Sequence, residues 1–229
     1  MADIDFLLDG GGDGCPTVLL AHGAGAPMDT PFMAAIASGL ASRGLRVARF
    51  EFAYMAARRS GGVKRPPPKV DLLQAEFLSA VSRFACEGPL IIGGKSMGGR
   101  VASLVADGLF SEGRICGLLC LGYPFHPSGK PERLRTAHLE TLKTPALVCQ
   151  GSRDPFGTRE DVAGYALPPA ISLCWLEDGD HDLKPRKTVT GFGQEHNLEA
   201  ACAAAAGWAK ELAQESAGKS RSRGRAPGG

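Results

Sequence analysis

Residues 90–99 read LIIGGKSMGG, and this stretch decides the fold. Its apolar start is typical of a buried strand, and Gly94-Lys95-Ser96-Met97-Gly98 then leads straight into an apolar helical pattern. In this G-x-S-x-G pattern, glycines flank the serine because a sharp turn presses its neighbours against other backbone, where a Cβ atom would clash. The helix that follows directs free N–H groups toward the serine. The stretch therefore predicts a strand, a sharp turn that carries Ser96, and a helix.

Two other interpretations of this stretch stay open. A glycine-rich turn with a serine also occurs by chance in many α/β proteins. Gly94-Lys95-Ser96 also resembles the end of a phosphate-binding Walker A loop, which requires a glycine five positions before Gly94. That position holds Pro89, and Gly88 misses it by one residue, which disfavours a nucleotide triphosphatase.

Apolar runs and amphipathic stretches alternate along the chain. The runs are apolar on successive residues, as in parallel strands that helices cover on both faces. We expect strands at 17–21, 45–52, 90–93, 115–121, 146–150 and 171–176, with an edge strand at 4–8. We expect helices at 31–43, from 71, from 97 and at 198–212. This alternation predicts a doubly wound, mostly parallel α/β sheet of six or seven strands with helices on both faces.

Local signals place some helix ends. Thr30 followed by Pro31 predicts a capped helix start, and Asp71 with Gln74 resembles a capping box. Residues 131–142 (PERLRTAHLETL) predict one more helix between two strands. Only 24 residues, 122–145, separate these two strands, so we expect no lid domain there.

The length of 229 residues predicts a single domain, at residues 1–215, followed by a tail at 216–229. The tail has four basic residues, no acidic one and no apolar period, and we expect it to be disordered. The net charge is +2, so the chain without its tail carries −2. A body so close to neutral disfavours nucleic-acid binding except weakly through the tail.

Neither the membrane nor the secretory route is indicated. No apolar run approaches the 18 to 20 residues of a membrane span, and residues 1–14 carry four aspartates and no basic residue. Seven cysteines, an odd number without metal-binding spacing, favour a reducing compartment. We expect a cytoplasmic protein that binds no metal and no organic cofactor.

The ends of later strands supply partners for Ser96. Asp154 follows the strand at 146–150, and His181 follows the strand at 171–176. The turn after 115–121 begins Gly-Tyr-Pro and has no carboxylate, which leaves Asp154 as the candidate acid. The order Ser, Asp, His is the order of a triad on such a sheet, in which His181 takes the proton of Ser96 and Asp154 orients His181.

An oxyanion hole is expected beside Ser96. Residues 22–26 (HGAGA) follow the strand at 17–21, and this turn is expected to supply the N–H of Ala24. The N–H of Met97 is the second expected donor. We expect His22 to order the turn rather than to act as a base.

Five blocks together resemble the α/β-hydrolase superfamily from about residue 17 to residue 212: HGAGA, GGKSMGGR, LGYPFHPSGKPERLR, QGSRDPFG and DGDHDLKP. More narrowly, they resemble its small lidless branch related to dienelactone hydrolases, with the testis-expressed protein 30 type and the hydrolase-like domain of NSL complex subunit 3. The resemblance implies the α/β-hydrolase fold and the triad roles of Ser96, Asp154 and His181. Dienelactone hydrolases themselves use a cysteine nucleophile, where this chain has Ser96.

The expected function is that of a serine hydrolase, which cleaves an ester, thioester or related acyl bond of a small molecule through an acyl-enzyme. A non-catalytic hydrolase-like domain that binds a partner protein is the alternative. Lys95, His126, Arg58 and Arg59 are candidate substrate contacts, the two arginines for an anionic group. An ordinary loop histidine and a solvated basic segment are the competing interpretations.

Overall fold

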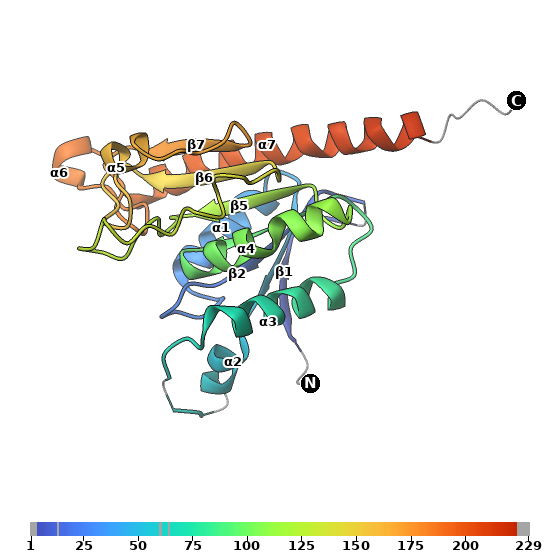
Figure 1. Cartoon of the computed structure of the whole chain (residues 1–229), viewed down its shortest axis with the longest axis horizontal. Helices are drawn as coiled ribbons and strands as arrows, with labels where there is room; N and C mark the ends of the chain where they lie inside the picture. Colours follow the sequence, from blue (N-terminus) through green and yellow to red (C-terminus); the bar gives the residue numbers. More distant parts are fainter. Residues whose placement is uncertain (1–3, 13, 60, 64, 224–229) are drawn as a thin grey trace, which may run out of the picture.

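The computed structural model describes residues 4–12, 14–59, 61–63 and 65–223. They form a seven-stranded sheet in the order β1-β3-β2-β4-β5-β6-β7 (Figure 1). The strands are β1 (Phe6–Asp9), β2 (Thr17–Ala21), β3 (Arg46–Phe50), β4 (Leu90–Lys95), β5 (Gly117–Leu121), β6 (Ala146–Gly151) and β7 (Ile171–Leu176). Only β1 runs antiparallel to its neighbour, β3. The chain passes from β2 to β3 on one side and then to β4 on the other, so the order reverses at β2. In sheets of this kind, ligands bind at the carboxyl ends of the strands beside such a point.

Helices cover both faces of the sheet. The helices are α1 (Pro31–Ala41), α2 (Ala53–Arg59), α3 (Val70–Arg83), α4 (Met97–Ser111), α5 (Arg159–Ala163), α6 (Lys187–Thr190) and α7 (Gln194–Arg223). Side chains of α1 and α7 form one apolar core with Val18 and Leu20 of β2, whereas those of α3 and α4 form the other core with Leu19. This alternation follows because successive residues of a strand point to opposite faces.

Burial explains why the strands read as continuous apolar runs. Every residue of β2, β4, β5 and β6 is buried, whereas the edge strands β1 and β7 are partly exposed. The predicted α/β-hydrolase fold, with a mostly parallel sheet and helices on both faces, is confirmed. No separate lid domain is present among the residues described.

Two local predictions were wrong. Residues 131–142 form turns instead of a helix, because the N–H of Arg135 bonds to the carbonyl of Phe125 and not to the preceding helical turn. The predicted capping box of Asp71 and Gln74 is absent, because helix α3 begins at Val70 and Asp71 lies inside its first turn. Lys69 occupies the N-cap position, and its side chain forms no capping hydrogen bond. Helix α7 continues to Arg223, past the predicted tail start at 216, and positions 224–229 lie outside the described residues.

Figure 1 shows α7 running along β7 and continuing beyond the sheet toward the C-terminus. Thr30 caps α1 as predicted, since its Oγ1 accepts a hydrogen bond from the N–H of Met33 at 3.3 Å. Within the described ranges, no helix combines the length and the apolar character that a membrane crossing needs.

Candidate active site

Ser96 occupies a strained turn between β4 and α4. Its φ of 52° and ψ of −114° lie in a region that L residues avoid, at a cost of about 1–3 kcal/mol. Gly94 and Gly98 permit the turn, because a Cβ atom on either one would meet the backbone of Ala21. The packed glycines therefore hold Ser96 in this conformation, as the G-x-S-x-G pattern predicts.

Two hydrogen bonds join Ser96 to residues from the ends of β6 and β7. Ser96 Oγ lies 2.8 Å from His181 Nε2, and His181 Nδ1 lies 2.8 Å from Asp154 Oδ2. Because Nδ1–H donates to the carboxylate of Asp154, Nε2 is left free to accept a proton from Ser96. The Asp154 side chain is fully buried, whereas His181 is about one-fifth exposed.

Gln150 and a backbone amide hold Asp154 in place. The side-chain amide of Gln150 donates to Asp154 Oδ2 at 3.0 Å, and the N–H of Phe156 donates to Oδ1 at 2.9 Å. The Phe156 ring also packs against the imidazole of His181, with 4.3 Å between the ring centroids. Gln150 was not among the predicted site residues, although a polar residue at the end of an otherwise apolar strand is a signal for such a role.

The loop that carries His181 is anchored by Asp178. The Asp178 carboxylate accepts hydrogen bonds from the backbone N–H and the guanidinium of Arg186. The hydrogen bonds from the Arg186 side chain and backbone lower the pKa of Asp178 to about 2. Asp178 and Leu183, on either side of His181, are the other two non-glycine residues with positive φ in the described ranges. This loop is therefore held in a strained shape by a buried carboxylate.

Lys95 links the turn that carries Ser96 to the same loop. Its Nζ donates to the carbonyl oxygen of His181 at 2.5 Å and lies 3.3 Å from Asp182 Oδ1. Burial lowers the pKa of Lys95, while the nearby carboxylate of Asp182 opposes this effect. Lys95 lines the cavity, where we expected a substrate contact, but its ammonium already has a partner within the chain.

His22 orders the turn on which Ala24 lies. Its Nε2 accepts from the N–H of Phe52 at 3.1 Å, so its Nδ1 carries the proton that bonds to the carbonyl of Gly23. Burial lowers the pKa of His22, which keeps the imidazole neutral. Tyr54 donates to the carbonyl of Ala24 at 2.8 Å and fixes the turn from its other side.

Ser96 borders a cavity of about 520 Å³ at the carboxyl ends of the strands. One wall is formed by the segment between β2 and α1, which includes Ala24, and by the start of α1, which includes Phe32. The other walls come from Lys95, Phe156, His181, Asp182 and Gln194. Met97 is the first residue of α4, and the N–H of such a position has no acceptor within its own helix.

The structure does not bring His126 or Arg59 into this cavity. His126 is buried, with its Nε2 3.6 Å from Asp161 Oδ2. Arg59 binds Glu51 through Nε at 2.7 Å and Asp29 through Nη1 at 2.8 Å, and these hydrogen bonds raise its pKa. Arg58 points its Nη1 at the sulfur of Met55, 3.3 Å away.

The contacts of Arg59 indicate a structural role. Glu51 also accepts a hydrogen bond from the N–H of Met28, and both Met28 and Asp29 belong to the segment that forms the cavity wall. Arg59 therefore ties α2 to this wall, and its charge is neutralised by two carboxylates. Among the described residues, no three His, Cys, Asp or Glu side chains come together as a metal site requires.

Residues 14–210 match the model of the alpha/beta hydrolase domain family. The chain belongs to this family. Solved structures of other alpha/beta hydrolases share the fold. One is Est1E from Butyrivibrio proteoclasticus with ferulic acid bound, which is 15% identical to this chain and has a TM-score of 0.66. The match covers 91% of this chain and 95% of the Est1E chain.

Two further structures resemble this alpha/beta hydrolase. Dienelactone hydrolase from Anabaena variabilis is 19% identical with a TM-score of 0.65, and 90% of each chain is covered. An α/β serine hydrolase without lid from Xanthomonas campestris is 18% identical to this chain, with a TM-score of 0.58. The match covers 79% of this chain and 81% of that hydrolase. At these identities, the similarity shows the fold alone.

Proposed function

We propose that the chain is a serine hydrolase that cleaves an ester, thioester or related acyl bond of a small molecule. The observation that carries this proposal is the unbroken hydrogen-bonded chain from Ser96 through His181 to Asp154, beside a cavity. The strained turn at Ser96 supports it further, because such strain persists where packing enforces it and is concentrated at functional sites.

The proposed reaction begins with attack by Ser96 Oγ on the acyl carbon. His181 Nε2 accepts the hydroxyl proton, and Asp154 stabilises the imidazolium that results. The carbonyl oxygen becomes an oxyanion, for which the N–H groups of Ala24 and Met97 are the proposed donors. His181 then gives its proton to the leaving group, and the acyl-enzyme remains on Ser96.

Water completes the cycle. His181 Nε2 takes a proton from a water molecule, the hydroxide attacks the acyl carbon, and the proton returns to Ser96 as the acid leaves. All atoms of this reaction come from the chain, the acyl substrate and water. A cavity of about 520 Å³ is within the range of small-molecule sites, so the proposed substrates are small or compact.

Labelling with a fluorophosphonate, together with a panel of chromogenic esters, tests this proposal. We expect wild-type protein to be labelled at Ser96 and to turn over esters. Ser96→Ala should abolish labelling and lower kcat by several orders of magnitude, as the loss of a triad serine costs on the order of 10⁶ in a serine protease.

Ser103→Ala is the matched control. Ser103 Oγ also lies 2.8 Å from a histidine nitrogen, His138 Nε2, but Ser103 is buried in α4 and does not line the cavity. This variant should keep labelling and turnover. Undiminished labelling of Ser96→Ala would reject the role of Ser96, and an unlabelled, inactive wild type would favour a binding module.

The narrower expectations from the sequence stay predictions. These are the branch with the testis-expressed protein 30 type, the domain boundary at residue 215, the cytoplasmic location and weak nucleic-acid contact through the tail. All seven cysteines have free thiols in the structure.

A further inference from the structure

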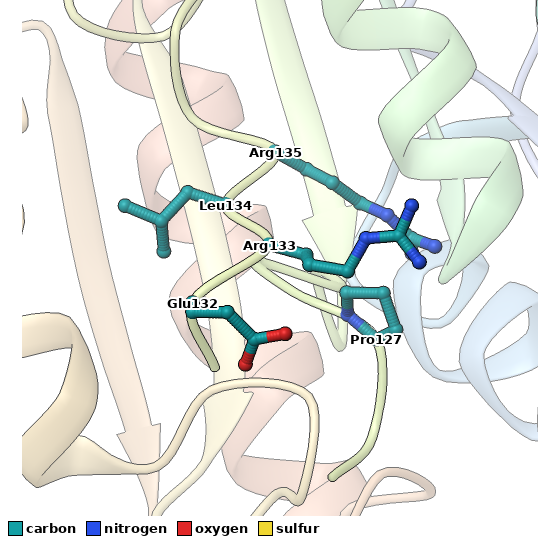
Figure 2. A pocket seen from close by; sticks show the side chains of 5 residues that line it. All are labelled: Pro127, Glu132, Arg133, Leu134 and Arg135. Atoms are coloured by element: carbon teal, nitrogen blue, oxygen red, sulfur yellow. The ribbon is translucent and has the colours of Figure 1, made fainter. Parts of the chain in front are cut away.

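A second cavity lies outside the site around Ser96. It is open, has a volume of about 630 Å³, and is formed by the segment between β5 and β6. Figure 2 shows the side chains of Arg133 and Arg135 extending to the same side as Pro127, while Leu134 points the opposite way. Glu132 completes the lining. None of these residues lines the cavity at Ser96, so the two cavities are distinct.

Arg100 belongs to the same cationic cluster. It lies in the first turn of α4, and its positive charge acts on Arg135. Its Nε is buried and has no hydrogen-bond partner. A buried guanidinium nitrogen without an acceptor is costly, so Arg100 adds an uncompensated cationic group next to Arg135.

Within the part of the chain that the structure describes, none of the three arginines has a paired carboxylate, and Glu132 is the acidic residue that lines the cavity. Their guanidinium groups form no hydrogen bond or ion pair there, and Glu132 forms none with them. Other arginines of the protein do bind carboxylates: Arg43, Arg49, Arg59 and Arg186 each have an aspartate or glutamate partner. Arg100, Arg133 and Arg135 differ from these four arginines and lie close to one another without a carboxylate partner.

The electrostatics of the cluster agree with this description. Burial lowers the pKa of Arg135, and the positive charges of Arg100 and Arg133 lower it further. The other polar groups packed here are Tyr123, Ser103 and His138. Tyr123 donates to the carbonyl of Arg135, Ser103 bonds to the carbonyl of Arg100, and burial lowers the pKa of His138. None of these groups carries a negative charge at neutral pH.

We propose that Arg100, Arg133 and Arg135 form a binding site for the oxyanion group, phosphoryl or carboxylate, of a small molecule. A guanidinium presents parallel N–H donors whose spacing matches two oxygens of such a group. An oxyanion would supply the acceptors that the three side chains lack and would offset their mutual repulsion. This proposal does not depend on the hydrolase activity, because it concerns binding alone.

Calorimetric titration of the full chain at constant ionic strength, set with sodium chloride, tests the proposal. The probes are inorganic phosphate, phenyl phosphate and benzoate, so the arms separate phosphoryl from carboxylate ligands. We expect saturable binding of at least one probe, weakened tenfold or more in Arg133→Gln and in Arg135→Gln. Arg114→Gln is the matched control, since it removes an exposed arginine from outside the cluster and should leave binding unchanged.

Thermal melting adds a readout that a purely structural role would not give. Without ligand, Arg135→Gln should melt at the same temperature as wild type or higher, because repulsion is relieved. Arg133 is exposed, so Arg133→Gln is expected to keep the fold. The proposal is overturned if no probe binds saturably, if both cluster variants bind as tightly as wild type, or if Arg114→Gln loses binding equally.

Discussion

The ammonium of Lys95 donates a hydrogen bond to the main-chain carbonyl of His181, with 2.5 Å between Nζ and the oxygen. Lys95 immediately precedes Ser96, so one buried side chain connects the serine turn with the loop of the histidine. Lys95 also lies over the ring of Phe32 in the cavity wall, 5.3 Å from its centroid. We interpret Lys95 as a positioning residue that holds His181 toward Ser96.

Lys95→Met should lower kcat about 10- to 100-fold with little change in KM. A hydrogen bond to a charged group contributes about 1.5–3 kcal/mol, and part of that energy here fixes the distance from His181 to Ser96. A positioning role predicts the same factor for every ester of a chromogenic series. If the factor varies strongly with the acyl group, Lys95 contacts the substrate instead.

Asp182→Asn is the control for this experiment. Asp182 lies near the Lys95 ammonium, but its side chain is two-thirds exposed. Exposed ion pairs contribute about 0–1 kcal/mol, so kcat should change by less than about fivefold. An effect as large as that of Lys95→Met would show that the ion pair, and not the bond to His181, matters.

Asp154→Asn should be the most damaging of the aspartate substitutions near His181. Asparagine keeps the shape but cannot stabilise the imidazolium, and in a serine protease the same change lowers kcat about 10⁴-fold. Asp180→Asn and Asp182→Asn should each retain most of the activity at equal amounts of folded protein. Steady-state kinetics measure kcat for each variant. An equal loss of kcat in Asp180→Asn would contradict the assignment of Asp154 as the acid of the triad.

Asp178→Asn should weaken the fold in a pH-dependent manner. The pKa of Asp178 is about 2 in the folded protein, below the value of about 3.9 in an unfolded chain. Its contribution is therefore complete above about pH 4 and is lost as the pH falls toward 2. The melting temperatures of wild type and variant should differ most above pH 4 and converge near pH 2. Glu140→Gln, at an exposed position, should show no such convergence.

Short acyl groups should be preferred over lipid-length ones. Each buried methylene contributes about 0.8 kcal/mol, which is about fourfold in kcat/KM, but only while it finds apolar surface. A cavity of about 520 Å³ with no separate lid domain over it among the residues described encloses only a short chain. Measurement of kcat/KM for p-nitrophenyl esters from C2 to C16 should show an early plateau, and a steady rise through C12 would contradict this.

Arg59→Gln should reduce stability without changing the preference between neutral and anionic esters. The variant leaves the nearly buried carboxylate of Glu51 without its partner, which costs about 1–3 kcal/mol, toward the lower end because Arg59 is 42% exposed. Chemical denaturation measures the stability change. A selective loss of activity toward anionic esters would contradict this and would support Arg59 as the substrate contact that the sequence predicted.

Much of the fold was predictable because its signals are local. A strand covered on both faces must be apolar along its whole length, and the glycines around Ser96 mark a turn that other residues cannot adopt. Asp154 and His181 were named for the same reason, since each directly follows a buried strand. The predicted helix at 131–142 failed because the N–H of Arg135 bonds to the carbonyl of Phe125, ten residues earlier, instead of to the preceding helical turn, and helical spacing does not reveal such a bond.

The sequence by itself determined the order of the strands, the main helices that cover the sheet, the turn at Ser96 and the strand ends at which Asp154 and His181 lie, but not the short helices α2, α5 and α6. Only the tertiary structure decided which charges are paired. In the folded chain, Arg59 binds Glu51 and Asp29, and His126 is buried beside Asp161. Arg133 and Arg135 have no carboxylate partner there among the residues described. The reason is physical: backbone conformation depends on neighbouring residues, whereas charge pairing depends on distances of a few ångströms between segments far apart in the chain.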